Sequence, residues 1–249
     1  WTGIAIGVLL AGPMVCGTSQ AVNDWFDRHV DAINEPGRPI PSGRMPGRWG
    51  FYIAVTWTVL SLVVATALGV WGFAAAVLGL VLAWAYSAPP LRLKRNGWLG
   101  NAAVGLCYEG LPWFTGAAVM TAALPNWRII LLALLYSIGA HGIMTLNDFK
   151  SVEGDIRTGI SSLPVRLGIT NAARLACAVM VASQIVVIGL LFVWGNRIHA
   201  GIVALLLIAQ IELMARLLRS PRERAAWYSA TGVTLYVLGM MVSAFALIG

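Results

Sequence analysis

Hydrophobic residues run continuously at eight places along the chain, and polar residues gather in the short segments between these runs. An α-helix needs about 20 apolar residues to cross the ~30 Å hydrocarbon core of a bilayer. The strands of a membrane β-barrel would be about half as long and would alternate in polarity. The runs therefore predict an all-α integral membrane protein, a multi-helix transmembrane bundle. The predicted helices cover approximately residues 2–22, 49–70, 71–87, 98–122, 128–146, 171–194, 199–215 and 226–248.

The composition excludes a soluble domain. Hydrophobic residues make up 59% of the chain and charged residues only 11%, with a mean hydropathy of +0.78. Soluble domains devote about a quarter of their residues to charge, because their surface must face water. Lipid is therefore the expected solvent, and we expect one transmembrane domain spanning residues 1–249.

The distribution of Lys and Arg predicts an orientation. Basic residues in short loops stay on the cytoplasmic side of a membrane. If the segment after the first run is cytoplasmic, only Arg128 and Arg197, of 17 Lys and Arg residues, lie on the opposite side. The formal net charge of +7 thus indicates loops that face the cytoplasm, and no nucleic-acid partner is expected.

The segment after the first run carries three acids at helical spacing. It begins Asn23-Asp24-Trp-Phe-Asp27-Arg28-His-Val-Asp31, and spacings of three and four residues place the carboxylates on one face of a helix. Like charges at that spacing repel one another unless a cation lies among them. Mg²⁺ is usually bound through one or two carboxylates together with substrate phosphates. A solvated helix end is the alternative, and three aligned acids make it the weaker interpretation.

The same opening occurs a second time, in Asn147-Asp148-Phe-Lys150-Ser-Val-Glu-Gly-Asp155, again after an apolar run. Each copy is followed by a cluster of Ser, Pro, Arg and Gly residues, as in a degenerate internal repeat. Two acidic helix ends could face each other across a cavity, each holding Mg²⁺, with a diphosphate between the metals. Basic residues must neutralise the remaining phosphate charge. The candidates are Arg28, Arg38, Lys150, and Arg92 and Lys94 in the loop that follows Tyr86.

These motifs resemble the UbiA-type intramembrane prenyltransferases over nearly the whole chain. The resemblance rests on Asn-Asp-x-x-Asp-x-x-x-Asp at 23–31, the second Asp motif at 148–155 and the loop at 86–94. Within the family, the segments around 31–43, 86–94, 108–113 and 147–155 look most like the chlorophyll and bacteriochlorophyll synthases, with a lean to the bacteriochlorophyll branch. Family members have nine transmembrane helices, so we expect the first helix to lie before Trp1.

The resemblance implies a reaction and its partners. Geranylgeranyl or phytyl diphosphate would esterify the propionate of chlorophyllide or bacteriochlorophyllide, in a bacterial inner or intracytoplasmic membrane with the active site facing the cytoplasm. Asp24, Asp27, Asp148 and Asp155 would hold Mg²⁺, with Asp31 as a further catalytic acid. Asn23, Arg28, Arg38, Tyr86, Arg92, Lys94, Asn147 and Lys150 would bind the diphosphate. A propionate is already ionised at neutral pH, so no strong general base is expected.

Two ionisable residues lie inside apolar runs, where such residues are often functional. Glu109 is near the middle of its run and His141 is about two turns from Asn147. Each could make a hydrogen bond within the bundle, or could line the cavity and face the pigment.

Three other functions stay open. The chain could prenylate a quinone precursor or a haem. It could be a transporter, although the repeated acids lie at the mouth of the bundle and not at the membrane midplane. It could also be a pigment-binding scaffold without activity.

Overall fold

The computed structural model of the protein describes residues 1–247. These residues form helices joined by short segments, and the chain divides into two compact units. Unit 1 comprises residues 1–94 and 111–125, and unit 2 comprises residues 95–110 and 126–249. The predicted all-α class is confirmed, and the single-domain organisation stays a prediction.

Unit 1 holds the first acidic motif. Its elements are α1 Thr2–Leu9, the π-helical η1 Leu10–Cys16, α2 Gly17–Asn34, α3 Trp49–Ala65, the 3₁₀ turn η2 Thr66–Leu68, α4 Gly69–Ser87 and α6 Leu111–Thr121. Within the unit, α2 packs against α3 and α4, and α4 packs against α6. Gly69, with φ +73°, separates η2 from α4, since a side chain would strain this conformation. One long apolar stretch thereby becomes two helices, as the sequence predicts.

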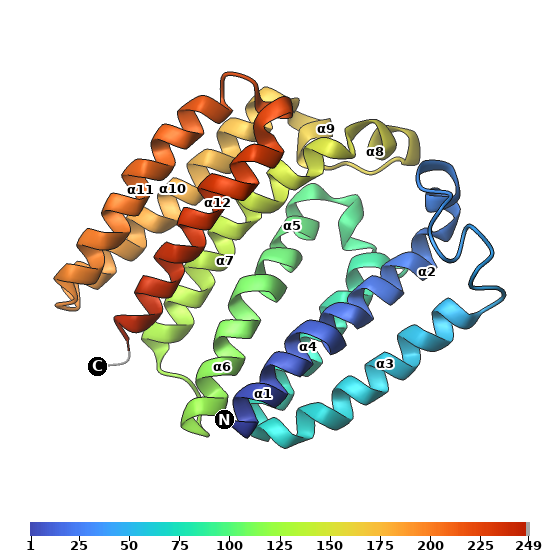
Figure 1. The fold of residues 1–249 in the computed structure, drawn as a ribbon, viewed down its shortest axis with the longest axis horizontal. Coiled ribbons are helices and arrows are strands. Elements are labelled where there is room, and N and C mark those ends of the chain that lie inside the picture. Colours follow the sequence, from blue (N-terminus) through green and yellow to red (C-terminus); the bar gives the residue numbers. More distant parts are fainter. Residues whose placement is uncertain (248–249) are drawn as a thin grey trace. The chain divides into compact units, whose positions relative to one another are not determined.

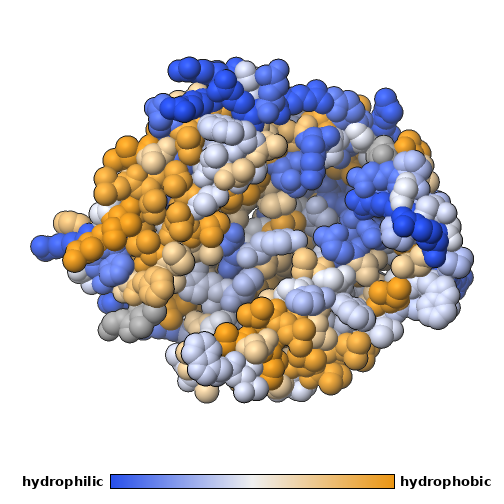
Figure 2. Space-filling model, in the orientation of Figure 1, coloured by the Kyte–Doolittle hydropathy of each residue, from blue (hydrophilic) through white to orange (hydrophobic). Residues whose placement is uncertain are grey.

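Unit 2 holds the second motif. Its elements are α5 Gly97–Gly105, the π-helical η4 Leu106–Gly110, α7 Trp127–Asn147, the 3₁₀ turn η5 Asp148–Lys150, α8 Val152–Thr158, α9 Leu163–Leu167, α10 Ile169–Val193, α11 Arg197–Leu217 and α12 Pro221–Phe245. Figure 1 shows α7, α10, α11 and α12 running alongside one another. Figure 2 shows hydrophobic side chains over α10–α12 and hydrophilic ones at the bundle end near α8 and α9.

Small residues allow α7 and α10 to approach closely. Ala172, Ala173 and Ala176 of α10 are fully buried. A Cβ atom on Gly142 of α7 would lie 2.5 Å from the carbonyl oxygen of Ala176, so only glycine fits there. Such packing is typical of membrane helices, where lipid gives no hydrophobic drive for association. This contact fixes the helix that ends at Asn147.

Among the described residues, six continuous helical stretches are long and apolar enough to cross a membrane. One of them, Trp49–Ser87, contains two of the predicted helices. The predicted helix at 98–122 corresponds to α5, η4 and α6 but is not among the six stretches, because Asn101, Tyr108 and Glu109 dilute its apolar run. The chain is an integral membrane protein.

Candidate active site

The acids of the first motif lie on α2, which is helical through all three of them. Arg38 joins two of these acids, since its Nη1 donates to Asp24 Oδ1 at 3.0 Å and to Asp31 Oδ2 at 3.2 Å. Seven residues make about two helical turns, so Asp24 and Asp31 share a face, as their spacing predicts. Arg38 Nε also donates to Glu35 Oε2 at 2.5 Å, and this hydrogen bond raises the pKa of Arg38. The guanidinium therefore stays charged.

Asp27 points to a different set of partners. Asn23 Nδ2 donates to Asp27 Oδ2 at 2.8 Å and to Ser87 Oγ at 3.2 Å. The other oxygen, Oδ1, forms an ion pair with Lys94 and lies 3.7 Å from an Arg92 nitrogen. The structure thus brings the end of α4 and the loop after it onto the acidic face of α2, as required of a site that holds both metal and phosphate.

Lys94 and Arg92 form a partly buried cationic pair beside Asp27. The Lys94 side chain is only 8% exposed, and burial lowers its pKa, while the hydrogen bond from Lys94 to Asp27 opposes this shift. Arg92 Nε is buried and has no hydrogen-bond partner among residues 1–247. Two cations here contact a single carboxylate. A further anion would balance the second positive charge, and the free donor of Arg92 is suited to a phosphate oxygen.

Two predicted diphosphate ligands of unit 1 make other contacts. Arg28 donates to the carbonyl oxygen of Trp25 at 2.6 Å, and its guanidinium lies 4.1 Å from the centre of the Trp25 ring. This places Arg28 against an indole and not in an ion pair with the acids. Tyr86 is half-buried in the last turn of α4, directly before Ser87. Their roles toward diphosphate stay predictions.

In unit 2, Asp148 lies directly after α7, at the start of η5. Asn101 Nδ2 donates to Asp148 Oδ2 at 3.3 Å and to Thr145 Oγ1 at 3.2 Å. Thr145 in turn donates to the carbonyl oxygen of His141. The buried amide of Asn101, on α5, thereby holds the Asp148 carboxylate against the end of α7.

Asp155 lies on α8 and accepts a hydrogen bond from Ser162 Oγ at 2.6 Å. Burial raises the pKa of Asp155, and the hydrogen bond from Ser162 opposes this shift. Asp148 and Asp155 are close enough for their charges to repel each other. Asn147 and Lys150, the other predicted ligands here, are exposed beside Asp148. The two motifs therefore differ locally, because the first lies within a continuous helix and the second spans a helix end, a 3₁₀ turn and a new helix.

The two ionisable residues of the apolar runs lie in unit 2. The ring of His141 lies 5.5 Å from the Trp98 ring and is tilted by 31°, and His141 also hydrogen-bonds to the Trp98 backbone. His141 thus has a hydrogen-bond partner within the bundle. Glu109 lies in η4 and makes no ion pair among the described residues. A cavity role for either residue stays a prediction.

The oxygen donors suit a hard divalent cation. Within residues 1–247, no group of three or more His, Cys, Asp or Glu side chains is gathered closely enough to hold a metal by itself. Mg²⁺ commonly takes one or two carboxylates and completes its shell with water and phosphate oxygens. In unit 2 the hydrogen-bond partners of Asp148 and Asp155 are neutral, an amide and a hydroxyl, and neither acid forms an ion pair among residues 1–247. The residues present therefore fit magnesium bound with a phosphate substrate.

Three residues of the site were missed by the sequence analysis, namely Ser87, Asn101 and Ser162. Each is buried and hydrogen-bonds to a residue of a motif. Asn101 could have been identified from the sequence, because an amide in an apolar run must find a polar partner in the bundle. Ser87 and Ser162 could not, since serine is common at helix ends.

Replacing Asn101 by leucine is expected to lower turnover about tenfold, because a bond to a charged group contributes roughly 1.5 kcal/mol or more. The change keeps the branched shape of the side chain and removes the donor to Asp148. Asn171→Leu is the control, since its exposed amide donates only to the carbonyl oxygen of Leu167. Initial rates in detergent measure the effect, and equal rates for both variants would remove Asn101 from the site.

Known proteins place these features in a family. The model of the UbiA prenyltransferase family matches residues 1–245. The bacteriochlorophyll synthase 33 kDa chains of Cereibacter sphaeroides and Rhodobacter capsulatus are 63% and 55% identical to this chain. These alignments cover 100% and 99% of the chain, and 82% of each relative. The chloroplastic chlorophyll synthase of Oryza sativa is 40% identical, over 96% of this chain and 65% of its own length.

A solved structure shares the fold. A UbiA homologue from Archaeoglobus fulgidus, bound to DMAPP and Mg²⁺, superposes with a TM-score of 0.73 at 20% identity, over 97% of this chain and 88% of that one. The helical arrangement, the paired Asp motifs and the full-length family match agree with the resemblance that the motifs indicated. The chain belongs to the UbiA prenyltransferase family.

Proposed function

We infer that this chain transfers a prenyl group from a prenyl diphosphate to the propionate carboxylate of bacteriochlorophyllide or chlorophyllide. The observation that carries this inference is the 63% identity, over the whole chain, to a bacteriochlorophyll synthase. The donor is geranylgeranyl or phytyl diphosphate. The allylic carbon–oxygen bond to diphosphate breaks, a carboxylate oxygen forms the new ester bond, and diphosphate leaves.

The acids of both units and the bases of unit 1 have different roles in this reaction. Asp24 and Asp27 in unit 1, and Asp148 and Asp155 in unit 2, would hold magnesium. When bound, magnesium supplies positive charge that stabilises the departing diphosphate. Arg38, Arg92 and Lys94 neutralise phosphate oxygens, since these bases already lie among the acids of α2. Their positions before substrate arrives are set by ion pairs, so little reorganisation is needed at the moment of bond cleavage.

The acceptor needs no base. A propionate is ionised at neutral pH and attacks as it stands. The acids of the two motifs agree with this chemistry, because each of them pairs with a base or accepts from a neutral donor. All but two of the 17 basic residues are predicted on the same side of the membrane as both motifs, which supports an active site facing the cytoplasm.

Acceptor choice tests the function. Purified protein in detergent, supplied with geranylgeranyl diphosphate and Mg²⁺, is expected to esterify bacteriochlorophyllide or chlorophyllide and to leave 4-hydroxybenzoate unchanged. Chromatography separates the esterified pigment from the free acid. Rapid prenylation of 4-hydroxybenzoate with no ester from either pigment would show a quinone-precursor enzyme instead.

A further inference from the structure

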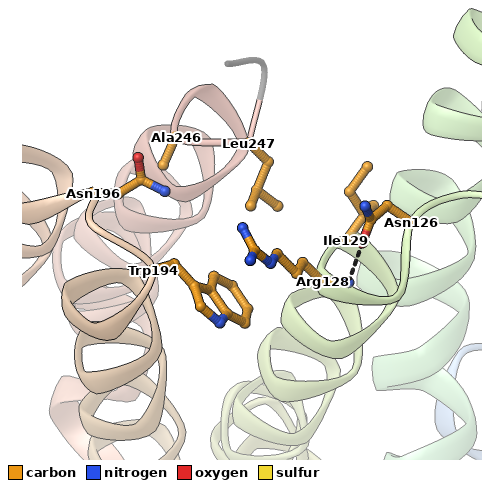
Figure 3. Close-up of a pocket in the computed structure, with 7 residues that line it drawn as sticks. All are labelled: Asn126, Arg128, Ile129, Trp194, Asn196, Ala246 and Leu247. Atoms are coloured by element: carbon orange, nitrogen blue, oxygen red, sulfur yellow. Dashed lines mark hydrogen bonds between the residues drawn. The ribbon is translucent and has the colours of Figure 1, made fainter.

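Unit 2 has a cavity of about 340 Å³ at the end of its bundle opposite Asp148. Three places along the chain line it, the start of α7, the turn between α10 and α11, and the residues after α12. Figure 3 shows the Arg128 side chain reaching from α7 toward Trp194 and Leu247. None of the residues proposed for prenyl transfer lines this cavity, so the cavity is separate from the candidate active site.

Arg128 lies near two aromatic rings and not beside an acid. Its guanidinium carbon lies 5.1 Å from the centre of the Trp194 ring and 5.8 Å from that of Trp127. The two indoles themselves meet edge to face, 5.6 Å apart. Arg128 makes no ion pair within residues 1–247. An arginine that contacts aromatic rings and has no acidic partner keeps N–H donors for an oxyanion.

The rest of the cavity lining has a polar part and an apolar part. Asn126 Oδ1 accepts from the Arg128 backbone N–H at 2.9 Å, which leaves the Asn126 amide nitrogen as a donor. Asn196 adds a second amide on the α10–α11 side. Ile129, Ala246 and Leu247 form the apolar part of the wall. A ligand that fits this cavity carries an anionic group next to an apolar one.

The position of the cavity favours a membrane lipid as its ligand. Tryptophan is typical of the interface between headgroups and acyl chains, and long arginine side chains near the ends of transmembrane helices reach toward the headgroups. Arg128 is exposed, so a headgroup can reach it from the membrane surface. We propose that this cavity binds the phosphate of an anionic phospholipid through Arg128, with the ester region of the lipid against the apolar wall. The proposal is independent of the transferase function.

Native mass spectrometry of the full chain, released from detergent and titrated with phosphatidylglycerol, tests the site. Arg128→Gln should weaken binding about tenfold, since a charge-assisted bond contributes roughly 1.4 kcal/mol or more. Arg197→Gln is the matched control, because Arg197 is predicted on the same membrane face and contacts an aromatic ring, Phe192, but does not line the cavity. This control should bind as the unmodified protein does.

Four results would overturn the proposal. These are unchanged binding in R128Q, an equal loss in R197Q, equal affinity for phosphatidylcholine, and equal affinity for soluble glycerol 3-phosphate, which would mark a free-phosphate site. If R128Q does not fold, Arg128→Lys decides the question. Lysine keeps the charge without the planar fork, so a several-fold loss supports the proposal and unchanged affinity overturns it.

Discussion

Replacing Asp148 by asparagine is expected to reduce prenyl transfer by about 10²–10³-fold, the usual effect of removing one group that stabilises transition-state charge. Asparagine has the same shape and still accepts a hydrogen bond from Asn101. The fold should therefore hold, while the charge that attracts magnesium is lost. Rates measured over a range of Mg²⁺ concentrations should show both a lower maximum and a higher Mg²⁺ requirement.

Glu153→Gln is the control for that change. Glu153 belongs to the same motif but is exposed and forms an ion pair with Arg222 on α12. Its removal should alter the rate less than twofold, since exposed ion pairs contribute little to stability and this one does not act on the substrate. Equal losses in both variants would show that net charge on the segment matters and that Asp148 holds no metal.

Much of the fold could be predicted because lipid leaves few choices for the backbone. Every amide within the hydrocarbon must be hydrogen-bonded, so an apolar run of sufficient length forms a helix. The run at 49–70 becomes α3 and the run at 128–146 becomes α7 within a few residues. The π-helical segments η1 and η4 were not predicted, because a local change from i→i+4 to i→i+5 hydrogen bonds leaves hydrophobicity unchanged.

The acids of the site could be predicted from spacing, but their partners could not. A helix places Asp24 above Asp31 whatever surrounds it, and the structure adds one guanidinium that joins them. The partner of Asn23 is Ser87, 64 residues away, and that of Asp148 is Asn101, 47 residues away. Such contacts depend on which helices pack together, which hydrophobic periodicity does not specify.

The two motifs differ in the partners of their acids, although their sequences look alike. In unit 1 the acids are ion-paired with Arg38, Arg92 and Lys94. In unit 2 an amide and a hydroxyl hold Asp148 and Asp155. Neutral donors leave a carboxylate's charge in place, so the second motif depends more on an added cation. The first motif already contains the bases that an incoming phosphate needs, which makes it the place where loss of a base should weaken substrate binding most.

Replacing Lys94 by methionine is expected to lower kcat/KM for the prenyl diphosphate about 100-fold. Methionine fills the same narrow space but removes the ammonium group from Asp27. Phosphate then meets one cation fewer, so KM should rise together with the fall in kcat. Lys94→Arg restores the charge and should recover part of the rate.

Arg95→Gln separates this effect from a general loss of positive charge. Arg95 is the next residue along the chain, but it is exposed and forms no ion pair among the described residues. Steady-state rates for the three variants and the unmodified protein, at saturating pigment and varied prenyl diphosphate, distinguish the cases. A selective loss in Lys94→Met places this ammonium group on the diphosphate. If Arg95→Gln loses as much activity, the loop acts through its overall positive charge near the membrane surface. The ion pair between Lys94 and Asp27 is then structural.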